Sequence, residues 1–123
     1  MLDPELSQLL DEVRAYEIRD MMHSANPAMY PRMRDNLARD LARFADVLQA
    51  HVEDVPNEDI KRFAHSLNGA SQSVGAKALG DLFVDLERLA KAGDLATMRC
   101  RHAESLTVIE RSLMALQQLD VPA

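Results

Sequence analysis

His65 is the residue best suited to nucleophilic chemistry, and a glycine follows it four positions later in the stretch FAHSLNGASQSVGA, residues 63–76. With an unperturbed pKa of about 6.5, much of an imidazole is neutral and nucleophilic near pH 7. At about 100° per residue, His65 falls roughly 140° from the middle of the apolar arc of a helix drawn through this stretch. We therefore expect His65 to face solvent. The arc that should face the core contains Ile60, Phe63, Ala64, Leu67, Ser71 and Val74.

Gly69 lies nearly opposite this arc, where packing inside the protein cannot compensate for a glycine. In a helix interior, glycine costs about 1 kcal/mol relative to alanine. One interpretation is that a partner needs close access beside His65. The other is drift at a surface position that tolerates the cost, and the spacing alone leaves both open.

No other pair of side chains gives a comparable site. Cys100 and His102 are two residues apart, which puts them on different faces of a helix and argues against a shared metal. His102 lies on an apolar stripe and is interpreted as a core or boundary histidine. His23 and His51 show no ligand spacing, so the sequence predicts no metal site.

Apolar stripes at helical spacing predict five helices, over about residues 4–23, 30–52, 58–75, 76–92 and 95–119. Asp3, Asn57 and Asp94 are expected N-caps, and Gly93 is expected just past a helix C-terminus. The last four helices, about 30–119, predict an all-α, antiparallel up-down-up-down four-helix bundle. The additional N-terminal helix, about 4–23, should cap one end of the bundle or cover one seam. The stripes place nine residues in one core: Leu37, Leu41, Phe44, Leu67, Val74, Leu82, Leu86, Ile109 and Leu113.

The chain of 123 residues favours a single domain over 1–123. Its net charge of −6 argues against nucleic acid and against anionic membranes as partners. No apolar run approaches the ~20 residues of a membrane span, and the start MLDPELSQLLDE lacks the basic residues of a signal peptide. A single cysteine, Cys100, indicates a reducing compartment. We expect a cytoplasmic monomer.

The stretch around His65 resembles the signature of histidine-containing phosphotransfer (HPt) domains, and the resemblance covers about residues 30–118. The matching positions are His65, Leu67, Gly69, Ser71, Gly75 and Ala76. The resemblance implies a phosphorelay intermediate of two-component signal transduction, in which His65 accepts a phosphoryl group from an aspartate of one receiver domain and passes it to another. Its implied partners are response-regulator receiver domains and a hybrid sensor histidine kinase. The receiver would carry Mg²⁺, and the chain would need no cofactor and turn over no substrate.

The neighbours of His65 receive two implied roles. Residues expected to support the phosphoryl group are Asn68, Lys61, Gln72 and Lys77, and residues expected to contact the partner are Arg62, Ser66, Gly69 and Ser73. Asn68 stands where the family has lysine, and Lys61 or Lys77 could supply the missing charge. Otherwise transfer is slow, or the chain is a degenerate module that binds a kinase or receiver without being phosphorylated. A plain helical interaction domain is the third possibility.

Overall fold

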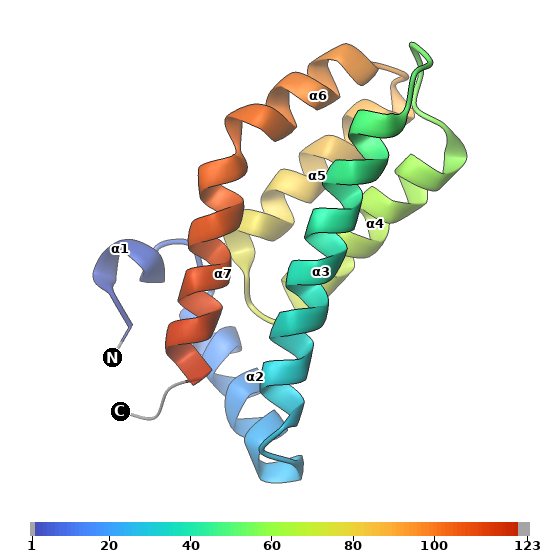
Figure 1. Cartoon of the computed structure of the whole chain (residues 1–123). Helices are drawn as coiled ribbons and strands as arrows, with labels where there is room; N and C mark the ends of the chain where they lie inside the picture. Colours follow the sequence, from blue (N-terminus) through green and yellow to red (C-terminus); the bar gives the residue numbers. More distant parts are fainter. Residues whose placement is uncertain (1, 121–123) are drawn as a thin grey trace.

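The computed structural model describes residues 2–120, and its secondary structure over that range is entirely helical (Figure 1). The predicted domain range of 1–123 also includes residues 1 and 121–123, which lie outside the described residues. The helices are α1 (Pro4–Ser7), α2 (Glu12–Ala25), α3 (Met29–Ala50), α4 (Glu58–Ser73), α5 (Lys77–Lys91), α6 (Leu95–Glu104) and α7 (Leu106–Asp120).

The central helices alternate in direction: α3, α4, α5 and the α6–α7 pair run up, down, up and down (Figure 1). The predicted all-α antiparallel bundle is therefore confirmed. Its core is centred on Phe44, whose ring packs edge-on against Phe63 and Phe83 at centroid distances of 5.5 and 5.1 Å. Such aromatic pairs add stabilisation beyond the area they bury.

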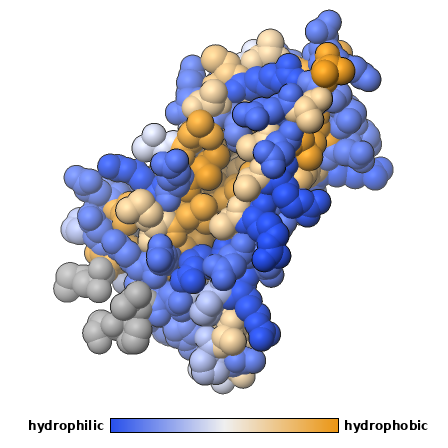
Figure 2. Space-filling model, viewed as in Figure 1, coloured by the Kyte–Doolittle hydropathy of each residue, from blue (hydrophilic) through white to orange (hydrophobic). Residues whose placement is uncertain are grey.

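Seven of the nine predicted core residues are buried, whereas Ile109 and Leu113 are only partly buried against the core. Both belong to α7, and Figure 2 shows apolar side chains gathered along α7 on the side toward α3. The helical phase predicted from the stripes is correct for α3, α4 and α5. On α7 it is wrong, because the buried face is formed by Ser112, Ala115, Leu116 and Leu119, and the predicted stripe is rotated toward solvent.

Helix ends follow the predicted caps. The carboxylates of Asp3 and Asp94 and the side-chain oxygen of Asn57 accept hydrogen bonds from backbone N–H groups in the first turns of α1, α6 and α4. Gly93 has φ +75° and follows α5, as predicted, and Gly75 has φ +80° after α4. Only glycine adopts this left-handed conformation without steric cost.

The predicted helix 95–119 is wrong in one respect, because it breaks at Ser105 into α6 and α7. Ser105 has φ −103° and ψ 8°, and its N–H donates to the His102 carbonyl in a tighter turn. Serine is a weak helix former, so one residue can leave the helical conformation at small cost. The apolar stripe continues across the break, which is why the sequence predicted one helix.

The predicted helix 4–23 is also wrong, because it is two helices, α1 and α2. Between them, the Leu9 carbonyl accepts a hydrogen bond from the Ala78 N–H at 3.0 Å, and the Asp11 N–H donates to the Gly75 carbonyl at 2.9 Å. These backbone groups therefore pair with the loop after α4 and with the first turn of α5 instead of within a helix. The segment covers that end of the bundle, which is one of the two expected placements.

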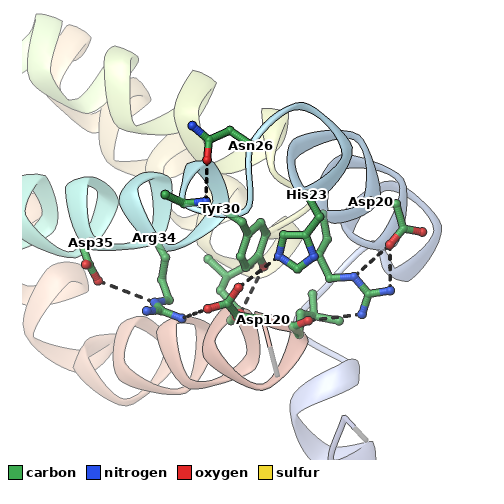
Figure 3. Close-up of polar contacts among 11 residues, drawn as sticks. Asp20, His23, Asn26, Tyr30, Arg34, Asp35 and Asp120 are labelled. Carbon is green, nitrogen blue, oxygen red and sulfur yellow. Dashed lines mark hydrogen bonds and ion pairs between the residues drawn. The ribbon is translucent and has the colours of Figure 1, made fainter. Parts of the chain in front are cut away.

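A polar cluster fixes α2 to the end of α7 (Figure 3). His23 from α2 and Arg34 from α3 converge on the Asp120 carboxylate, with N–O distances of 3.2 and 3.0 Å. Arg19 donates to the Leu119 carbonyl, and the buried Tyr30 hydroxyl donates to a carbonyl of α7. Burial is the main cause that raises the pKa of Tyr30 to about 12. The cluster joins the N-terminal segment to the bundle.

His102 is buried, with 8% of its surface exposed, as predicted for a core or boundary histidine. Burial lowers the pKa of its imidazole below the unfolded value of about 6.5. At acidic pH, His102 therefore binds a proton more readily in the unfolded state than in the folded state. The neutral, buried ring contributes its full stability above pH 6.5, and this contribution to the free energy of unfolding is lost as pH falls toward the folded pKa.

We expect His102→Leu to reduce the loss of unfolding free energy between pH 7.5 and 5.5. Urea unfolding of wild type and variant across this range measures the difference. Parallel pH curves for the two proteins would contradict the prediction.

Candidate functional site

His65 lies in the middle of α4 and projects away from the core. Its neighbours Ala64 and Leu67 are buried, whereas the His65 side chain is 74% exposed. The prediction that His65 faces solvent is therefore confirmed. The apolar stripe of α4 packs toward the bundle and leaves the opposite side free to carry a reactive ring.

Glu87 of α5 holds one nitrogen of this ring. Its two carboxylate oxygens lie 2.9 and 3.1 Å from Nδ1 of His65. An ionised carboxylate can only accept hydrogen bonds, so Nδ1 carries the proton. In the neutral ring, the lone pair is then on Nε2. The contact therefore sets both the ring orientation and the tautomer, and it leaves the Nε2 lone pair free.

Glu87 is itself held by Lys91, one turn further along α5, with a distance of 2.8 Å between Nζ and Oε2. The Glu87 side chain is only 10% exposed. The hydrogen bond from Lys91 is the main cause that lowers the pKa of the Glu87 carboxyl; burial opposes it, and the hydrogen bond from His65 adds to it. Glu87 is therefore ionised at neutral pH and ready to accept the Nδ1 proton.

Two open grooves meet at His65, and both are also lined by Glu87 and Lys91. The first, of about 480 Å³, is completed by Glu58, Lys61 and Arg62. The second, of about 340 Å³, is completed by Asn68, Val84 and Arg88. The ring thus stands between a groove with additional cations from α4 and a groove with an exposed valine from α5.

The structure brings three of the expected neighbours to His65: Lys61 and Arg62 in the first groove and Asn68 in the second. Ser66 and Gly69 are exposed on α4. The side-chain oxygen of Asn68, Oδ1, is buried without a hydrogen-bond partner among the described residues. The side-chain nitrogen, Nδ2, is therefore the end that can donate toward the groove.

Ser66 and Gly69 line neither groove, and the same is true of three other expected residues. Gln72 packs against α5, where a Cβ on Gly80 would lie 2.4 Å from its Nε2. Lys77 begins α5, ten residues before Glu87, which is about 15 Å along the helix axis. Ser73 donates to the Ala70 carbonyl and lines a separate depression between α2, α3 and α4.

Glu87 and Lys91 were missed by the sequence analysis. The signal available was their spacing, because a glutamate four residues before a lysine forms a favourable pair on a helix. That pattern is common on solvated helices, and only the packing of α5 beside α4 shows that the pair faces His65.

A comparison with known families agrees with this geometry. The family model described as Hpt domain matches residues 31–120. The chain belongs to the Hpt domain family. No curated protein and no solved structure matches the chain significantly. Hpt domains are phosphotransfer carriers, so membership supports a phosphotransfer role in two-component signalling. The match covers α3 to α7 and leaves out α1 and α2.

Over residues 2–120, no helix is long and apolar enough to cross a membrane. Within the same range, no three His, Cys, Asp or Glu side chains are grouped so that they could hold a metal ion.

Gly69 has open space around it, because a Cβ built there meets nothing within 4 Å. We therefore expect Gly69→Ala to stabilise the protein by up to about 1 kcal/mol. Gly69→Gln should keep the fold but slow phosphoryl transfer from a receiver, because its side chain projects beside His65. Urea unfolding and transfer time courses measure the two effects. Equal transfer rates for Gly69→Gln and wild type would show that partner access does not require this glycine, and would favour its origin by drift at a tolerant surface position.

Proposed function

We propose that this Hpt domain is a phosphorelay intermediate that accepts a phosphoryl group on Nε2 of His65 and exchanges it with an aspartate of receiver domains. One observation carries the proposal: an exposed histidine on a rigid helix has its Nδ1 fixed by a buried carboxylate and its Nε2 free. Phosphoryl transfer needs little from a protein beyond positioning and charge stabilisation. Those are the two functions that this site can supply.

The chemical step balances within the two partners. The Nε2 lone pair forms the N–P bond while the bond between phosphorus and the receiver's aspartyl oxygen breaks, and that electron pair leaves on the carboxylate. The ring becomes more positive and keeps its Nδ1 proton, which Glu87 stabilises through the hydrogen bond. In the reverse step, the N–P pair returns to Nε2. A ring that keeps its proton is the better leaving group, so the same contact helps onward transfer.

The remaining parts of the proposal follow from this division of roles. The domain carries the group and does not turn over a substrate, so it is not an enzyme in the usual sense. The receiver supplies the aspartate and Mg²⁺, and a hybrid sensor histidine kinase starts the relay.

The exposed free thiol of Cys100 suits a reducing compartment such as the cytoplasm. We further propose that the domain acts as a monomer.

Glu87 gives a graded test of the chemistry. We expect Glu87→Ala to slow phosphoryl uptake by about tenfold to a hundredfold, by analogy with the loss when a carboxylate that orients a metal-binding histidine is removed. Glu87→Gln should be intermediate, because an amide oxygen still accepts from Nδ1–H but carries no charge. The matched control is Asp81→Ala, an exposed carboxylate of α5 that lines neither groove at His65. Equal rates for Glu87→Ala and Asp81→Ala would remove Glu87 from the mechanism.

Incubation with a phosphorylated receiver separates this function from the two alternatives. Acid-labile phosphate on the Hpt domain, with loss from the receiver, supports the proposal. Receiver binding without phosphate uptake would identify a degenerate module. Neither binding nor uptake, tested across a panel of receivers, would leave a plain helical interaction domain.

A further inference from the structure

The position three residues after His65 carries no charge, because Asn68 occupies it. An amide offers phosphoryl oxygens a neutral hydrogen bond, roughly half as strong as one from a cation. A phosphoryl group on Nε2 would place two negative charges beside a site whose nearest carboxylate is the ionised Glu87. A cation within reach of Nε2 is therefore the feature that the site needs.

Lys91 has the geometry to supply that cation. Its Nζ lies 2.8 Å from Oε2 of Glu87, which lies 3.1 Å from Nδ1 of His65, so Nζ is within about 6 Å of the ring, where unit charges interact appreciably near a protein surface. An ammonium group has three donors, and Glu87 is the only hydrogen-bond or ion-pair partner of Nζ among the described residues. The side chain is 69% exposed and lines both grooves. Lys91 therefore keeps donors unused while it holds Glu87, and it borders the space on both sides of the ring.

The other cations near the site are placed less well. Lys61 and Arg62 line only the first groove, and their charged ends face Glu58 at 4.0 and 3.9 Å. Arg88 lines only the second groove and is paired with Asp85. Lys91 differs from all three because it is joined to the ring through Glu87 and borders both grooves.

We propose that Lys91, from α5, binds the phosphoryl oxygens on Nε2 of His65 and so replaces the charge that α4 lacks at Asn68. The inference rests on the proposed function. Lys91 contacts the transferred group but forms and breaks no covalent bond. One N–H of its ammonium group donates to Glu87, and the other N–H groups donate to phosphoryl oxygens. A cation supplied by the neighbouring helix makes a lysine at position 68 unnecessary.

The test measures the lifetime of phospho-His65 made chemically with phosphoramidate, which phosphorylates exposed histidines without a partner protein. Phosphopeptide mapping follows His65 separately from the other histidines. We expect Lys91→Gln to shorten this lifetime about fivefold at low salt, and less at high salt, since water and salt screen a partly exposed charge. Lys91→Arg should restore most of the lifetime. Lys77→Gln is the matched control, since Lys77 lines neither groove, and it should stay within about twofold of wild type. Lys61→Gln is the comparison within the site and should shorten the lifetime less than Lys91→Gln does.

A double-mutant cycle with Asn68→Lys tests whether the two positions supply the same charge. We expect Asn68→Lys to lengthen the lifetime by less than about twofold in wild type but by about fivefold in the Lys91→Gln background, because neighbouring groups with one shared role are not additive. The ¹⁵N signals of the unphosphorylated His65 ring should be the same in Lys91→Gln and wild type. A change in those signals would mean that Lys91 acts only by positioning Glu87, and would overturn the inference.

Two further results would also overturn it: a lifetime in Lys91→Gln equal to wild type, or an equal shortening in Lys61→Gln. Failure of the proposed function is distinguishable from all of these. In that case phosphoramidate still labels His65, and the lifetimes can be compared, while a phosphorylated receiver transfers nothing to the wild-type domain.

Discussion

Replacing Gly75 with alanine is expected to lower the free energy of unfolding by about 2–5 kcal/mol, the largest stability effect that we predict. Gly75 has φ +80°, where an L-residue costs about 1–2 kcal/mol. A Cβ there would also lie 2.6 Å from the backbone nitrogen of Ala15 and 2.8 Å from its Cα. Forcing such an overlap apart adds about 1–3 kcal/mol. Urea unfolding of variant and wild type measures the difference.

Gly93→Ala is the matched control. Gly93 has a similar φ of +75°, but a Cβ there meets only Val55 Cγ1, at an ordinary 3.7 Å. This variant should lose only the backbone cost of about 1–2 kcal/mol. If both variants lose the same amount, the close approach of α2 to the loop between α4 and α5 contributes no stability, and the account of how the N-terminal segment joins the bundle is contradicted.

The bundle was predictable because its helices are locally encoded. The stripe of α4 set the phase that buries Leu67 and exposes His65, and caps such as Asn57 and Gly93 marked the ends. The bounds of α3, α4 and α5 lie within two residues of the prediction. The break before α2 was not predictable, because it depends on how the backbone groups of Leu9 and Asp11 pair with a distant part of the chain. The break at Ser105 was not predictable, because the apolar stripe of the sequence continues across it.

The candidate site was predictable only on one helix. The exposure of His65 and the open space at Gly69 followed from spacing within α4. The contact of His65 with Glu87 joins residues 22 positions apart, and it depends on the register of α5 against α4. Apolar stripes show which face of a helix is buried but not how far two helices slide along each other. The ion pair of Glu87 with Lys91 was visible in the sequence, but its target was not.

His65→Gln is expected to abolish phosphoryl uptake completely and to leave stability within about 0.5 kcal/mol of wild type, as for most surface substitutions. The His65 side chain is 74% exposed, and among residues 2–120 its one hydrogen-bond partner is Glu87. Glutamine fills similar space but offers no nucleophilic nitrogen. Uptake from a phosphorylated receiver and urea unfolding measure the two effects. His51→Gln is the control and should keep the wild-type rate.

The most direct measurement is the chemical position of the phosphoryl group after transfer from a phosphorylated receiver. NMR of protein labelled with ¹⁵N in its histidine rings, combined with phosphopeptide mapping, identifies both the residue and the nitrogen. We predict one phosphoryl group, on Nε2 of His65, with Nδ1 still protonated and bound to Glu87. Phosphate on His23, His51 or His102, or on Nδ1 of His65, would contradict the account.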